Sequence, residues 1–227
     1  MSNPLSLPDL TRSDAASIIT STWRVGGRER QRAAADATMS LWDRLPWPED
    51  CISLNCYLST DGQLIWFLGQ WTSEEAHRVF TRTQREEIAR GVDGVVPNIE
   101  RLGVIRSRRH TSLPRPEGVY PGCIVVVTIA TDDPARQVRV AETMAAHVAR
   151  PPSGTSLAGG LGAHLFFSTD GTRVLNYAEW TSERAHQEAL DGGALGSKRG
   201  IFDGMAGIQG IGVDRYTLYR RLVRPAR

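Results

Sequence analysis

The stretch Asn176-Tyr177-Ala178-Glu179-Trp180-Thr181-Ser182-Glu183-Arg184-Ala185-His186 decides the fold, because the chain carries most of it twice. The earlier copy ends in Gln70-Trp71-Thr72-Ser73-Glu74-Glu75-Ala76-His77. The same tetrapeptide, Ser-Thr-Asp-Gly, precedes both copies, at 59–62 and at 168–171. All of these motifs recur with one constant displacement of 109 residues, which indicates an internal duplication.

The duplication predicts two domains of about 100 residues each in a chain of 227 residues. A hydrophobic fraction of 41% and a charged fraction of 23% are typical of a soluble globular protein. We expect an N-terminal tail over 1–14, a first domain over 15–112, a linker over 113–120 and a second domain over 121–227. The linker assignment rests on three prolines and a glycine between Leu113 and Pro121.

Charge and hydropathy argue against several classes of partner. The net charge is only +2 and the arginines are spread over both halves, so a nucleic-acid partner is not expected. No apolar run approaches the ~20 residues of a membrane span, and the N-terminus does not resemble a signal peptide, so we expect a cytoplasmic protein. The three cysteines lack C-x-x-C spacing, which favours reduced core residues over a metal site or disulfides.

Both halves follow the order strand, helix, strand, strand, helix, strand. In the first half we expect strands at 17–23, 51–58, 64–71 and 100–111, a helix at 28–45, and a second helix capped by Thr72 or Ser73. In the second half we expect strands at 123–130 and 210–223, a hairpin within 161–180, and helices at 134–149 and 182–190. Each hairpin is centred on an Asp-Gly pair, the strongest short-range turn signal.

This order predicts an α+β protein made of two tandem ferredoxin-like (βαββαβ) domains. The strands are near-continuous apolar runs, so both faces of each sheet should be buried. Two helices cover only one face. We therefore predict that the two sheets pack on each other as an intramolecular dimeric α+β barrel, and leave further homo-oligomerisation open.

A βαββαβ half, a helix with an acidic first turn after a strand ending in Trp-x-Ser-Glu, and a pairing of two such sheets resemble the antibiotic biosynthesis monooxygenase family. The resemblance covers residues 15 to 112 and 121 to 223. It implies the dimeric α+β barrel fold and oxygenation of a phenol or anthrone by molecular oxygen, without flavin, haem or metal. The family pattern places an asparagine four residues before the tryptophan. Asn176 and Trp180 match it, whereas the first half has Phe67 before Trp71.

Residues four apart on a strand point to one side, so Asn176, Ala178 and Trp180 should share a face. A planar substrate could then lie along Trp180 while the Asn176 amide donates a hydrogen bond to a developing oxyanion. The candidate bases are His186, on the next helix, and His164, on the partner strand. A two-residue loop would pair His164 with Tyr177, on the wrong face, and a three-residue loop would pair it with Asn176.

We also assign substrate contacts to Phe166, Tyr177, Trp71 and Phe67. Five of the six tryptophans lie in the first half and fifteen of the 22 glycines follow the start of the linker, which predicts the larger cavity in the second half. The glycine-rich loop 191–207 is the expected lid over it.

The resulting hypothesis is a cofactor-independent monooxygenase that oxidises a polycyclic aromatic intermediate of antibiotic or polyketide biosynthesis, with oxygen as co-substrate. Two alternatives remain at this point: a non-oxidative polyketide cyclase, and a non-catalytic ligand-binding pseudo-dimer. For each single histidine and tryptophan the structural role is the competing interpretation, because a tryptophan at a strand end is more often a core anchor than a reacting group.

Overall fold

The chain folds as an α+β protein in two compact units. The computed structural model describes residues 7–149, 157–195, 200–202 and 204–224. These residues form eight strands, five α-helices and one 3₁₀ turn, in the order that the sequence predicts except for one extra helix. The first unit contains residues 1–107 and 216–227, and the second contains residues 108–215.

The border between the units differs from the predicted linker at 113–120. It falls after Ser107, inside β4 (Glu100–Leu113), and β8 (Ile208–Val223) is divided as well, since residues from Tyr216 onward belong to the first unit. The physical reason is strand length. These strands have 14 and 16 residues, more than twice the usual length, so each has one part in either unit.

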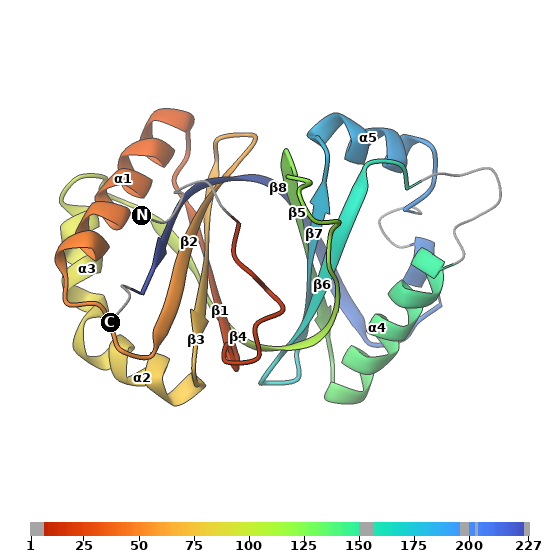
Figure 1. Ribbon diagram of the computed structural model, residues 1–227, viewed down its shortest axis with the longest axis horizontal. Helices are drawn as coiled ribbons and strands as arrows, with labels where there is room; N and C mark the ends of the chain where they lie inside the picture. Colours follow the sequence, from red (N-terminus) through yellow and green to blue (C-terminus); the bar gives the residue numbers. More distant parts are fainter. Residues whose placement is uncertain (1–6, 150–156, 196–199, 203, 225–227) are drawn as a thin grey trace. The chain divides into compact units, whose positions relative to one another are not determined.

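The first unit is an antiparallel sheet with the strand order β4–β1–β3–β2–β8. Figure 1 shows its three helices on one face of this sheet. A single second helix was predicted, but the residues after the cap form two, because Gln84 leaves helical geometry (φ −125°) between them. The elements are β1 (Ser17–Arg24), α1 (Arg28–Arg44), β2 (Cys51–Ser59), β3 (Leu64–Trp71), α2 (Glu74–Thr83) and α3 (Arg85–Asp93).

The second unit has the strand order β8–β5–β7–β6–β4. β7 pairs antiparallel with both β5 and β6. Figure 1 shows α4 and α5 on one face of this sheet. The elements are β5 (Cys123–Thr131), α4 (Pro134–Ala149), β6 (Gly160–Ser168), β7 (Arg173–Trp180), α5 (Glu183–Asp191) and the 3₁₀ turn η1 (Gly200–Phe202).

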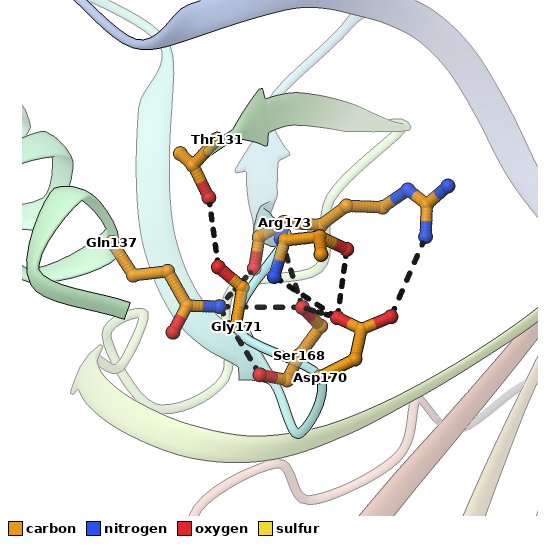
Figure 2. Close-up of polar contacts among 7 residues, drawn as sticks. Thr131, Gln137, Ser168, Asp170, Gly171 and Arg173 are labelled. Atoms are coloured by element: carbon orange, nitrogen blue, oxygen red, sulfur yellow. Dashed lines mark hydrogen bonds and ion pairs between the residues drawn. The ribbon is translucent and has the colours of Figure 1, made fainter. Parts of the chain in front are cut away.

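The duplicated Ser-Thr-Asp-Gly turn has the same hydrogen bonds in both units, and Figure 2 shows the second copy. Gln137 Nε2 of α4 donates to the carbonyls of Ser168 (3.1 Å) and Arg173 (2.7 Å), and Ser168 Oγ donates to Asp170 Oδ1 at 2.6 Å. Gly171 adopts φ +77°, a conformation that glycine tolerates best. The buried glutamine therefore fixes the first helix of the unit to the hairpin of its sheet.

In the first unit, the equivalent contacts involve Gln31 of α1. Its Nε2 donates to the carbonyls of Ser59 (3.1 Å) and Leu64 (2.6 Å), while Ser59 Oγ donates to Asp61 Oδ1 at 2.6 Å. Gly62 has φ +81°. The two turns thus share geometry as well as sequence, although the glutamine was not part of the motif by which the duplication was detected.

Part of the predicted loose tail is packed against the first unit. Leu10 is buried, and Gln70 Nε2 donates to the Asp9 carbonyl at 2.7 Å. The three cysteines are buried and free, as predicted. None of the helices in the described part of the chain combines the length and apolarity needed to cross a membrane.

Candidate functional site

An apolar cavity of about 110 Å³ lies in the first unit between the helices and the sheet. Its walls are mostly aromatic and aliphatic side chains from all three helices and from four strands. The lining residues that the argument uses are Trp23, Phe67, Trp71, His77, Arg85 and Arg101. An engineered cavity of ~150 Å³ holds a benzene ring, so this one is slightly smaller than an aromatic ring requires without side-chain adjustment.

The local sequence places Trp71 and His77 together. Trp71 is the last residue of β3, and Ser73 caps α2 by accepting a hydrogen bond from the Ala76 N–H at 3.1 Å. This turn from strand to helix brings His77 of α2 against the indole, edge to face, with ring centroids 5.2 Å apart. The recurring Trp-x-Ser-Glu motif is therefore the device that fixes a tryptophan–histidine pair.

His77 is a buried imidazole with an unused nitrogen. The residue is 8% exposed, and its Nδ1 has no hydrogen-bond partner among the described residues. Burial is the main cause that lowers the pKa of His77 from 6.5 to about 4, with smaller contributions from the positive charges of Arg106 and Arg85 and an opposing one from Glu74. At neutral pH the ring is therefore uncharged, and its Nδ1 is a buried polar atom that no described residue satisfies.

The second unit repeats the tryptophan–histidine pair, but the Nδ1 of its histidine has a hydrogen-bond partner, which that of His77 lacks among the described residues. Trp180 and His186 are again edge to face, 5.1 Å apart, and Ser182 caps α5. Here, however, Arg215 Nε donates to His186 Nδ1 at 2.9 Å. Burial, then the Arg215 charge, lowers the pKa of His186 to about 4. The nitrogen that is unused in His77 is thus occupied in His186.

The arginine motif Gly-Val-x-Arg is also duplicated, at 103–106 and at 212–215. Arg106 of the first unit corresponds to Arg215, but its Nε is buried without a hydrogen-bond partner among the described residues. Its nearest carboxylate is Glu74, whose Oε1 lies 4.0 Å from Arg106 Nε. The two copies therefore differ in whether arginine and histidine bond each other.

Asn176 lies where the sequence predicts it, in the middle of β7. It pairs with Val127 of β5 and shares strand parity with Ala178 and Trp180, which pack with residues of α5. Asn176 is 9% exposed, and its Oδ1 has no partner among the described residues. The asparagine and Trp180 therefore share a face, but neither lines the first-unit cavity.

Three of the predicted site residues do not share that face. β6 pairs His164 with Tyr177 and Phe166 with Leu175, so these side chains point to the side opposite Asn176. His164 Nδ1 lies 2.9 Å from Ser112 Oγ. The register that would have made His164 a base beside Asn176 is therefore wrong, and Phe166 and Tyr177 do not form one binding site with Asn176. The observed pairing of His164 with Tyr177 is the one that the two-residue-loop alternative predicted, although the residues between the strands are the four of 169–172.

The larger cavity lies in the second unit, as predicted. A pocket of about 300 Å³ is lined there by Arg108, Arg109, His110, Phe167, Ser168 and Thr169. The smaller apolar cavity described above, between helices and sheet, lies in the tryptophan-rich first unit. In the second unit, Ala194 packs with Trp180 and Phe202 packs with Val140 of α4, so described parts of the glycine-rich loop fill space under the helices. His147 Nε2 lies 2.6 Å from the Ala194 carbonyl. Residues 196–199 and 203 of the loop lie outside the described residues.

Sequence reasoning assigned Trp71 and Phe67 to substrate binding, and both line the cavity. It missed Trp23, Arg85 and Arg101, and it did not include His77 among the candidate site residues. The duplication itself contained a signal for His77, which stands 109 residues before the candidate base His186. Within the described residues, no three His, Cys, Asp or Glu side chains are grouped to hold a metal ion.

The fold is similar to solved structures of low sequence identity. An anthrone oxidase-like protein matches with a TM-score of 0.68 and 12% identity, over 92% of this chain and 93% of that one. A provisionally named monooxygenase of Fusobacterium nucleatum subsp. nucleatum matches with a TM-score of 0.57 and 11% identity, over 92% and 95%.

A variant of chlorite dismutase from Candidatus Nitrospira defluvii matches with a TM-score of 0.51 and 13% identity, over 92% of both chains. No family model and no curated protein matches the sequence. At these identities the likeness shows a fold found in monooxygenase-like proteins, and the fold alone.

Proposed function

We propose that the protein is a monooxygenase that oxidises an electron-rich aromatic phenol or anthrone with molecular oxygen, in the cavity of the first unit. The observation that carries the proposal is an apolar, aromatic-lined cavity that is also lined by a neutral histidine, with a nitrogen that no described residue satisfies, and by two arginines. Apolar pockets with a few converging polar groups and a perturbed pKa are typical of active sites.

The chain would promote ionisation of the substrate hydroxyl. His77 Nδ1 accepts a hydrogen bond from the phenol, and the charges of Arg85 and Arg106 that lower the pKa of His77 also favour a phenolate over a phenol. Since an imidazole with a pKa of about 4 is a weak base, the arginine charges supply much of the driving force. Contacts with Trp71 and Phe67 fix the orientation of the substrate ring.

The reaction itself needs only the substrate and oxygen. The phenolate or enolate transfers one electron to O₂, and the two radicals combine to a peroxide at the activated carbon. Loss of water from this peroxide leaves a quinone carbonyl, so one oxygen atom enters the product and the other leaves as water. We propose that no flavin, haem or metal takes part, with the protein shaping the cavity and stabilising the anion.

Three further parts of the hypothesis are also proposals. These are a role in antibiotic or polyketide biosynthesis, a polycyclic substrate, and packing of the two units as an intramolecular barrel. Asn176 remains a second candidate position, because a buried amide oxygen without a partner is costly unless a ligand or water satisfies it.

Turnover with and without oxygen tests the proposal. We expect the purified protein to convert anthrone to anthraquinone with one O₂ consumed per product molecule, and to form no product under argon. A cyclase would form product from its substrate equally well under argon. Tight binding of aromatic compounds, with no turnover of any phenol or anthrone, would instead favour a ligand-binding protein.

A further inference from the structure

The opening of the first-unit cavity is positively charged. Arg85, the first residue of α3, lines the cavity and is exposed, and it makes no ion pair with a described residue. Arg101 of β4 lines the same cavity. The described residues that line it include no aspartate or glutamate. An anion at the cavity would therefore meet the exposed guanidinium of Arg85, which has no described ion pair, and Arg101, whose charge is shared with Asp93.

Arg101 is held in a fixed orientation. Its terminal nitrogens donate to the two oxygens of Asp93 at 2.8 and 3.3 Å, and its Cζ lies 4.8 Å from the centroid of the Trp23 ring. Its Nε is buried and has no hydrogen-bond partner among the described residues. Arg101 thus keeps one charge-assisted donor that no described residue satisfies.

The volume of the cavity limits which part of a ligand can lie near the Arg101 side chain. A volume of about 110 Å³ is slightly smaller than one aromatic ring requires, so with side-chain adjustment the cavity admits at most a single ring beside Trp71 and His77. Any further ring or substituent must extend toward the opening, where Arg85 is exposed. The hydroxyl and the charged end of such a ligand would then lie at opposite ends of the molecule.

We infer that the site selects aromatic acids, in which a carboxylate remote from the reacting hydroxyl is bound by Arg85 and Arg101. The inference rests on the proposed function for the identity of the reacting hydroxyl, but the binding of the carboxylate does not depend on oxygenation. Arg85 and Arg101 act as specificity-determining residues in this account.

The second copy lacks both charges. The residues 109 positions after Arg85 and Arg101 are Ala194 and Gly210. Ala194 is fully buried in the cluster of Trp180. Selection of acids should therefore be a property of the first unit alone.

Binding of a matched pair of ligands to the full chain tests the inference. 2-Naphthol and 6-hydroxy-2-naphthoate differ only by the carboxylate, and quenching of tryptophan fluorescence reports both, since Trp23, Trp42 and Trp71 line the cavity. We expect the acid to bind about tenfold more tightly, as for a charge-assisted contact. Arg85→Gln and Arg101→Gln should each abolish most of this preference without weakening 2-naphthol. Arg90→Gln, on the same helix but outside the lining, should preserve it.

Equal affinity of the two ligands for the native chain would overturn the inference, and so would an unchanged preference in both cavity variants. If Arg101→Gln lowers the melting temperature, Arg85→Gln decides, because its exposed side chain bonds no described residue. Oxygen consumption is recorded with the same two compounds. Selective binding without turnover would refute the proposed function only, and turnover of both without selectivity would refute this inference only.

Discussion

His77→Gln is expected to lower the rate of oxygen consumption with a phenolic substrate by about 100-fold, the usual scale for loss of a proton-transfer group. Glutamine retains a polar side chain of similar reach but cannot take a proton at neutral pH. His186→Gln is the matched control, because His186 occupies the same place in the second unit but bonds Arg215 through Nδ1. That control should retain a rate within about twofold of the native chain.

The comparison also distinguishes the two units as sites of reaction. Equal losses in both histidine variants would contradict a single reactive cavity. A large loss in Asn176→Ala, with His77→Gln unaffected, would move the site to the second unit. Circular dichroism and the melting temperature establish that each variant is folded before rates are compared.

Acid should destabilise the folded chain well before its carboxylates are protonated. His77 and His186 both have a pKa of about 4 in the folded state, against about 6.5 when unfolded. Between these two pH values the unfolded chain binds more protons than the folded chain. The free energy of unfolding therefore falls as the pH falls from about 6.5 to about 4. At about 1.4 kcal/mol per pKa unit, each histidine contributes on the order of 3 kcal/mol.

One buried carboxylate works in the opposite direction. Burial raises the pKa of Glu179, and its ion pair with Arg115 at 2.7 Å counteracts this only in part. Protonation of Glu179 therefore stabilises the folded state as the pH falls. Urea unfolding at pH 7 and pH 5 measures the net effect. The double variant His77→Gln, His186→Gln should lose most of the pH dependence, and an unchanged dependence would show that other groups cause it.

The sequence was sufficient for the order of the elements, apart from the break at Gln84, and for the place of His186 on the helix that follows Trp180. Hydrophobic periods, the Asp-Gly turns and the serine caps are local signals, and each acts within a few residues. Because the sequence is duplicated, each helix or strand assigned in one half supported the equivalent assignment in the other half. The packing of helices on one face of each sheet followed from the same patterns.

Three features of the site depended on information that no local pattern carries. The face of His164 depended on the hairpin register, which the length of one turn decides. The apolar cavity of the first unit depended on how aromatic side chains from several elements pack. The predicted lid depended on how a glycine-rich loop folds, and the described part of that loop is packed inward, with Ala194 and Phe202 in the core.

A crystal structure of the chain with 6-hydroxy-2-naphthoate bound tests the central claim most directly, namely that the first unit holds the aromatic ligand. We predict electron density for the ring in contact with Trp71 and His77, with the hydroxyl oxygen within hydrogen-bonding distance of His77 Nδ1. Ligand density beside Asn176 and Trp180, with the first-unit cavity empty, would contradict the account.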